Sequence, residues 1–438
     1  MKDNYCIYCL MLAITFLSAC ATRAVVPLSS MIKASELSDI EKARSASISN
    51  PDFTTISNAA LAVSESTSAA KSTVEERKQA LEVLRWDARP RLVPSARLDT
   101  NPQSVGGDPD DTSSSYRLAL QQPFLDFGRH ASLSKQAKMD VSLAQIEHWQ
   151  ERNLAVHDAL EHYVEYLRYR DLAELSKTYI EKHVELEKNI KDRVNGGVAD
   201  RSELSLIEIR LKELVHQAQN DQRKQEAAWQ EFNDQTDLSR DSIQNIIEEM
   251  IFEVILPEDS VHASPSVLWA QQSLQQAREN RKEVKSGSMP SVVLEAYLAN
   301  NSEDTSKGLA LSLESSSFAG FAFRSHLKSA DAEIHTARTA LAKAIEDYDR
   351  ESRRISLVHS DLVASKASLV EQSAQTQQAV TLFFEQFQSG VKPIMNAISV
   401  YESDLDIMRQ LVSAQADIRL NKIRKANLMG VIAPFPAP

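Results

Sequence analysis

Two stretches of the chain, residues 129–194 and 321–389, contain neither glycine nor proline. Within the first stretch, apolar side chains recur at helical spacing, for example at Leu160, Val164 and Leu167. Because a helix rises about 1.5 Å per residue, each stretch predicts a helix roughly 100 Å long, which exceeds the diameter of an ordinary domain. Helices of this length need partner helices along their whole surface, so the sequence predicts a coiled coil or a helical tube.

Short segments with a period of two residues precede both long stretches. Apolar and polar side chains alternate in residues 91–100, 115–122, 291–300 and 309–314. Polar, turn-rich loops at 101–114 and 301–308 join these segments in pairs. The pattern predicts four strands in two β-hairpins, each with one apolar and one polar face. The polar face carries Arg91, Arg97, Arg117, Gln121 and Glu295.

Three landmarks recur in the same order at nearly one offset. The pairs are Pro94 and Pro290, 196 residues apart, Phe124 and Phe318, 194 apart, and Gly197 and Gly390, 193 apart. This agreement predicts two copies of one unit: helix, β-hairpin, long helix, tight turn and return helix. We place the copies at 57–233 and 266–429, with strand regions at 91–124 and 291–317. An insert at 234–265 separates the copies, and a tail at 430–438 follows them.

The N-terminal residues have the features of a leader peptide. The apolar stretch from Tyr5 to Leu17 has the length of a signal-peptide core and is too short for a membrane span. It ends in Leu17-Ser18-Ala19-Cys20, which resembles the lipobox of bacterial lipoproteins. That resemblance implies a signal peptide over 1–19, lipidation of Cys20 and a tether over 20–56. The alternatives are an ordinary signal peptide or a buried hydrophobic end.

The net charge, the cysteine positions and the hydropathy of the chain argue against several kinds of partner, site and membrane segment. The net charge of −12 argues against a nucleic-acid partner. All three cysteines, Cys6, Cys9 and Cys20, lie in the leader, so we expect no disulfide framework and no CxxC metal site. No stretch after the leader reaches 18 consecutive apolar residues, and we therefore expect no transmembrane helix there.

Motifs of enzyme chemistry are missing from the sequence. It contains no GxGxxG, P-loop or GxSxG pattern. His157 and His162 flank Asp158 and Glu161, but their five-residue spacing differs from HExxH, and a solvated helical face is the simpler interpretation. We therefore expect no enzyme activity, no cofactor and no metal.

Five segments in order carry a family resemblance over about residues 57–432. They are PSARLDT (94–100), YRLALQQPFLDFGR (116–129), RVNGGVADRSELSLIEIRL (193–211), PSVVLEAYLA (290–299) and FQSGVKPIMNAISVYESDLD (387–406). The ordered set resembles the TolC-like outer-membrane efflux and secretion channels, or outer membrane factors. The resemblance implies a mainly α fold with a small antiparallel β part and a two-repeat protomer. It further implies a trimer that forms a twelve-stranded transmembrane β-barrel and a periplasmic α-barrel, with the insert as an equatorial belt.

The function implied by this resemblance is a passive exit duct in the bacterial outer membrane that extends into the periplasm. The implied partners are two further copies, outer-membrane lipid, a periplasmic adaptor (membrane fusion) protein and an inner-membrane ABC or proton-driven pump. Type I protein secretion and small-molecule efflux both stay open. The alternative is a structural or adaptor periplasmic lipoprotein without a channel, although such a spacer has no need of repeated amphipathic strands.

The two tight turns, at 193–203 and 387–396, are the candidate site. Gly196 and Gly197 suit the end of a helix, and Asp200 with Glu203 has the spacing of a capping box. In the resembled family these turns close the duct and meet the adaptor. The implied contact and gating residues are Arg193, Gly197, Glu203, Phe387, Gly390, Lys392 and Asn396.

Two further expectations concern the second turn. Pro393, after Gly390, suits the first turn of a helix. We hypothesise that Glu203 and Lys392 form an ion pair that helps to hold the closed state. Many channels of the resembled family carry acidic residues six and nine positions after the second tip glycine, where this chain has Asn396 and Ser399. The resemblance therefore does not extend to an acidic ring at the pore entrance.

Overall fold

The computed structural model describes residues 51–100, 112–197, 199–243, 264–301, 305–314, 322–389 and 394–433. Its first half contains α3 (Pro51–Val63), α4 (Glu65–Asp87), β1 (Arg91–Thr100), β2 (Thr112–Leu125), α5 (Arg129–Asn195), α6 (Arg201–Thr236) and α7 (Arg240–Ile243). Its second half contains α9 (Pro265–Gly287), β3 (Ser291–Asn301), β4 (Thr305–Glu314), α10 (Ala322–Gln388) and α11 (Ile394–Leu428). The predicted signal peptide, Cys20 and most of the predicted insert lie outside the described residues.

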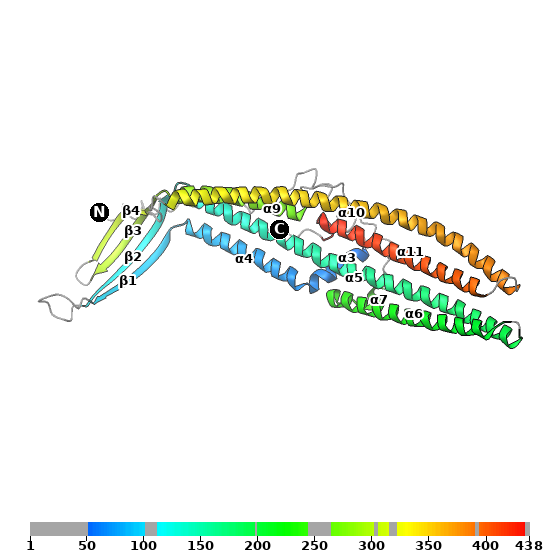
Figure 1. The fold of residues 1–438 in the computed structure, drawn as a ribbon. Coiled ribbons are helices and arrows are strands. Elements are labelled where there is room, and N and C mark those ends of the chain that lie inside the picture. Colours follow the sequence, from blue (N-terminus) through cyan, green and yellow to red (C-terminus); the bar gives the residue numbers. More distant parts are fainter. Residues whose placement is uncertain are drawn as a thin grey trace.

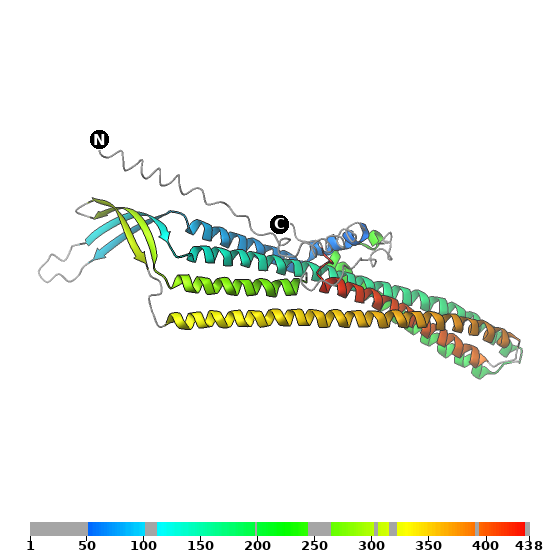
Figure 2. The same cartoon turned by 90° about the horizontal axis from the view of Figure 1, so that it is seen from above.

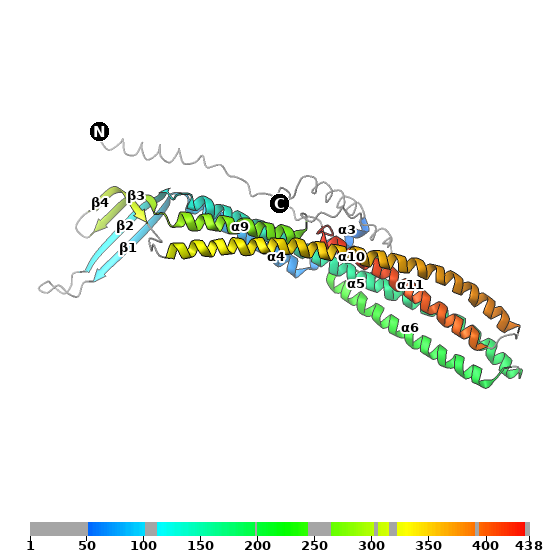
Figure 3. The ribbon, with the colours of Figure 1, turned by 45° about the horizontal axis from the view of Figure 1, so that its top comes forward.

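The molecule is an elongated helical bundle with a small sheet at one end (Figure 1). Helices α5 and α10, each of 67 residues, run from the sheet to the opposite end. Helices α4 and α6 pack on successive parts of α5, and α9 and α11 follow each other along α10 (Figure 2). Figure 3 shows the hairpins α5–α6 and α10–α11 ending together, opposite the sheet.

The predicted two-repeat fold is confirmed. Helices α4 and α9 both have 23 residues, α5 and α10 both have 67, and α6 and α11 have 36 and 35. One difference concerns the range 20–56 that we assigned to a tether. Helix α3 begins at Pro51, inside that range, because Phe53 and Ile56 are buried against the bundle core.

The four strands form one antiparallel sheet in the order β1-β2-β3-β4. Strand β2 pairs with β3, for example Leu118 with Leu298, so the sheet joins the two repeats. Alternation places on one face the exposed leucines Leu92, Leu118, Leu294, Leu298, Leu309, Leu311 and Leu313. On the other face, Arg117 donates to Glu295 at 2.7 Å and lies over the ring of Tyr297.

The junction between β2 and α5 is set by its local sequence. A register shift after Pro123 ends the regular pairing with β3. Gly128 then takes a positive φ of 85° directly before the helix. The Asp126 carboxylate accepts the N–H groups of Gly128 at 3.0 Å and His130 at 2.8 Å, which satisfies free donors at the start of α5.

The largest apolar core lies midway along the bundle, where α3, α5, α6, α9 and α11 meet. Trp149, Tyr163 and Phe232 are its largest fully buried side chains. The chain beyond α11 also enters this core, because the Asn153 side-chain oxygen accepts the N–H groups of Ile432 at 3.1 Å and Ala433 at 3.0 Å. The first four residues of the predicted tail, 430–433, are therefore part of the core. Within the described residues, no helix is both long and apolar enough to cross a membrane.

Gly430 offers a test of this packing. It has a φ of +72°, and an added Cβ would lie 2.6 Å from Pro265 Cγ and 2.8 Å from Trp149 Cζ2. We expect Gly430→Ala to lower the free energy of unfolding by about 2–4 kcal/mol. Alanine is strained at this left-handed φ, and its Cβ overpacks the site. Gly128→Ala is the matched control, since its φ is also positive but nothing lies within 4 Å of the added Cβ. Thermal unfolding should show a larger loss of stability in Gly430→Ala than in Gly128→Ala. Equal losses of stability in the two variants would contradict the packing argument.

Candidate functional site

The first tip is the turn between α5 and α6. Helix α5 ends with the Gly196 N–H donating to the Asp192 carbonyl at 3.0 Å, and Gly197 follows with a φ of +73°. Asp200 caps α6 as predicted, but its carboxylate accepts the N–H of Ser202 at 3.1 Å. The capping-box prediction is therefore wrong in its details, because the Glu203 N–H donates to the backbone carbonyl of Asp200.

The two tips pack against each other through an apolar cluster. Its buried members come from all four helices of the two hairpins and are Leu186, Ile190, Ile207, Phe387, Ile394, Ala397 and Ile398. Phe387 is almost fully buried there. Burial of such a ring contributes about 1.5–3 kcal/mol, so the cluster holds the tips together.

Arg193 adds a polar link between the hairpins. Its Nη1 donates to the Phe387 carbonyl at 2.8 Å, and its guanidinium lies 4.7 Å from the centre of the Phe387 ring. Because α10 ends at Gln388, that carbonyl is one of the last four, which have no partner within the helix. Helix α10 has no basic residue in its own last turn, so Arg193 places the positive charge that a helix C-terminus favours.

The structure places the other predicted tip residues as follows. Gly197 lies on the exposed turn, Glu203 is half-buried in the first turn of α6, and Asn396 is exposed in the first turn of α11. Gly390, Lys392 and Pro393 lie outside the described residues. The Glu203–Lys392 ion pair therefore stays a prediction.

Sequence reasoning missed a buried polar layer behind the tips, between α5 and α11. The Tyr179 hydroxyl donates to the Asp404 carboxylate, and His183 Nδ1 lies 2.8 Å from the Tyr179 carbonyl. Burial raises the pKa of Tyr179 and lowers the pKa of His183. Tyr179 and His183 are four residues apart and share one helix face, which was the available signal, but nothing local identifies Asp404 as their neighbour.

A buried ion pair lies further along the same helices. Arg409 of α11 makes two contacts with the Asp221 carboxylate of α6, at 2.8 and 3.2 Å, and its Nη1 lies 3.1 Å from the Ser176 hydroxyl of α5. This bidentate geometry fixes the position of α11 relative to α6. Three helices are thereby joined at one level of the bundle.

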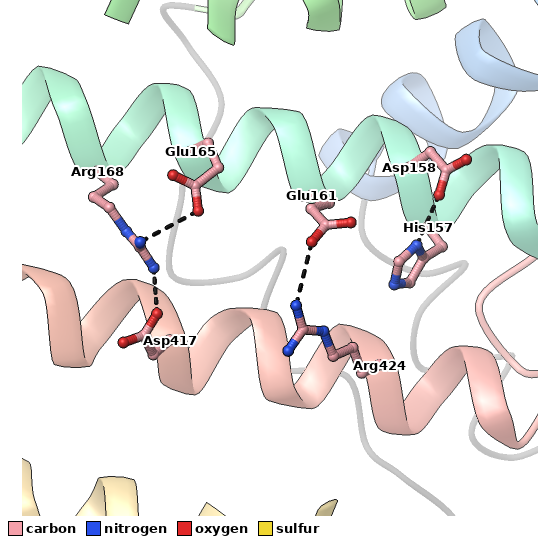
Figure 4. A network of polar contacts seen from close by, with 7 residues as sticks. All are labelled: His157, Asp158, Glu161, Glu165, Arg168, Asp417 and Arg424. Carbon is pink, nitrogen blue, oxygen red and sulfur yellow. Dashed lines mark hydrogen bonds and ion pairs between the residues drawn. The ribbon is translucent and has the colours of Figure 1, made fainter. Parts of the chain in front are cut away.

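Figure 4 shows a third polar region, near the middle of the bundle. Arg168 of α5 contacts Glu165 at 3.4 Å and also pairs with Asp417 of α11. Arg424 of α11 lies 3.4 Å from Glu161 of α5. Burial raises the pKa of Glu165, and the nearby Arg168 opposes that effect. Charged groups therefore connect α5 and α11 at two points within the region of Figure 4.

The same region contains a possible cation-binding group. Ligand atoms of His157, Asp158 and Glu161 lie within 4.8 Å of one another. However, His157 Nδ1 is 2.9 Å from Asp158, and the guanidinium of Arg424 already lies beside Glu161. The side chains of Asp158 and Glu161 therefore already have partners, and we assign no metal to the three residues.

Comparison with known proteins agrees with this architecture. No family model and no curated protein matches the sequence. Among solved structures, the channel-forming protein CusC has a TM-score of 0.77 at 14% identity, over 88% of this chain and 92% of that one. VceC, an outer membrane protein of Vibrio cholerae, gives 0.75 at 16%, over 88% and 97%. The open-state MtrE outer membrane channel of Neisseria gonorrhoeae gives 0.74 at 17%, over 87% and 89%. The chain has the fold of these channels, as its sequence predicts.

Arg193→Ala tests the link between the tips. We expect it to loosen the end of α10, because the Phe387 carbonyl loses a charged donor whose contribution is about 1–2 kcal/mol. Amide hydrogen exchange near residues 384–389 should then accelerate about tenfold. Arg201→Ala is the control, since Arg201 is an exposed arginine of the same tip. Equal acceleration in both variants would contradict the assigned role.

Proposed function

We propose that this protein is the outer-membrane exit duct of a tripartite export system. In this proposal the duct is passive, and an inner-membrane pump supplies the energy through a periplasmic adaptor. The single observation that carries it is the sheet, whose one face is covered with exposed leucines while the other is charged. The fold shared with CusC, VceC and MtrE supports the same conclusion.

The exposed leucine face supports contact with lipid. Leu309, Leu311 and Leu313 are 70%, 69% and 70% exposed on the outer strand β4. Water disfavours an apolar patch of this kind, whereas the hydrocarbon of a membrane accepts it. The charged face with Arg117 and Glu295 then lines a wet interior.

The open ends of the sheet support association with further copies. Strands β1 and β4 are its two edges, and unpaired edges are unstable in lipid. Three copies that close a ring of twelve strands remove every edge. Helix α10 has a similar need, because its apolar residues Leu357, Val370 and Leu382 are exposed. A neighbouring copy covers both features in the proposed homotrimer.

The tips support the proposed contact with an adaptor. They lie opposite the sheet, so they face the periplasm if the sheet lies in the outer membrane. Arg193 and the Phe387 cluster hold the two hairpins together there, which suits a closed state that a partner opens. The class of inner-membrane pump that works with the adaptor would distinguish type I protein secretion from small-molecule efflux. Lipidation of Cys20 is part of the same proposal.

A charge on the leucine face should block insertion. We expect Leu311→Lys to reduce heat-resistant trimers in the outer-membrane fraction, because lysine near the middle of a bilayer costs about 2–4 kcal/mol. Ala310→Lys is the matched control, since Ala310 is the preceding residue of β4 and its side chain lies on the opposite face. Normal trimer levels in Leu311→Lys would argue against the membrane role of this face.

Cross-linking in whole cells should identify the partner at the tip. The three natural cysteines all lie within the first 20 residues, so Asn396→Cys places a single thiol at the exposed tip. We expect capture of a periplasmic adaptor, identified by mass spectrometry, and no such capture by Ser72→Cys on the exposed surface of α4. Capture of peptidoglycan-associated proteins alone would instead favour the structural lipoprotein.

A further inference from the structure

The polar layer between α5 and α11 contains two buried atoms that lack partners. Tyr179, His183 and Asp404 are 3%, 1% and 2% exposed. Within the described residues, His183 Nε2 and Asp404 Oδ1 have no hydrogen-bond partner. A buried polar atom without a partner costs about 1–3 kcal/mol, so two in one layer call for an explanation beyond packing.

The hydrogen bonding of His183 assigns its tautomer. The Tyr179 carbonyl, 2.8 Å from Nδ1, only accepts hydrogen bonds, so Nδ1 carries the proton of the neutral ring. Nε2 is then the basic atom, and it is enclosed in the helix interface. Protonation of Nε2 creates a buried cation with a second N–H group and no acceptor in the present arrangement.

The groups that face His183 come from several helices. From α11, the Tyr401 ring lies 5.9 Å from the imidazole, and Glu402 favours its charged form. Asp404 is engaged by the Tyr179 hydroxyl. From α5, Lys182 disfavours the charged form.

Glu185 of α5 is a further charged neighbour, because it raises the pKa of the Tyr401 hydroxyl, and apolar side chains from two other helices also pack against the layer. Phe384 of α10 packs against Tyr401, and Leu214 of α6 packs against Tyr179. Burial is the largest effect on His183 and lowers its pKa below 6.5, the ordinary value for histidine. Glu402 therefore does not compensate for the loss of water around the ring.

We propose that His183 is a pH-sensitive switch, in which protonation of Nε2 loosens the packing of α5 against α11 behind the tips. The direction follows from linkage. Because the packed state binds the proton more weakly than an opened state with a solvated ring, packing is strongest above pH 6.5 and weakens as the pH falls below it. The proposal goes beyond the export function and concerns the helix interface itself.

The test is hydrogen exchange of the full chain in detergent between pH 7.5 and pH 5.0, corrected for the intrinsic effect of pH. We expect peptides from 175–190 and 398–408 to lose protection on acidification. His183→Gln keeps an amide donor but cannot titrate in this range, and His183→Leu is a second variant in case the first packs poorly. Both should retain their protection at pH 5.0.

His216→Gln is the matched control, because His216 is an exposed histidine of α6. This variant should lose protection as the unchanged protein does. A loss of protection in the His183 variants equal to that of the unchanged protein would overturn the proposal, and so would constant protection of the unchanged protein across this pH range. Neither readout requires export activity, so failure of the proposed duct would be seen separately.

Discussion

A helix of 67 residues is too long to be buried within one domain, and the rest of this structure depends on that constraint. Helices α5 and α10 each need apolar cover over roughly 100 Å. The chain meets the need with pairs of shorter helices, α4 with α6 and α9 with α11, that cover successive parts of each long helix. The largest core lies where these shorter helices approach one another, and residues 430–433 complete it.

Apolar burial alone leaves long helices free to slide, because the hydrophobic effect has no direction. Charged contacts between different helices remove that freedom at several levels. Arg409 with Asp221 joins α11 to α6, and Arg168 with Asp417 joins α5 to α11. At the tip, Arg193 contacts a backbone carbonyl of another helix instead of a carboxylate.

The two repeats are joined at both ends of the molecule by different chemistry. At one end, backbone hydrogen bonds between β2 and β3 unite the sheet. At the other end, the apolar cluster around Phe387 and the Arg193 contact hold the hairpin tips. Side-chain contacts break and reform more readily than a paired sheet, so movement is expected at the tips. The buried His183 lies close behind these tips.

The sequence by itself determined the elements and their repetition. The predicted long helices, 129–194 and 321–389, agree with α5 and α10 within one residue at each end, because glycine and proline interrupt helices locally. Alternation likewise identified the two faces of the sheet. Only the tertiary structure decided the β2–β3 pairing and the burial of α3. It also decided that His183 of α5 packs against α11, the helix that contains Asp404. Periodicity tells which side of an element is apolar, but the partner of that side depends on contacts between residues far apart in the chain.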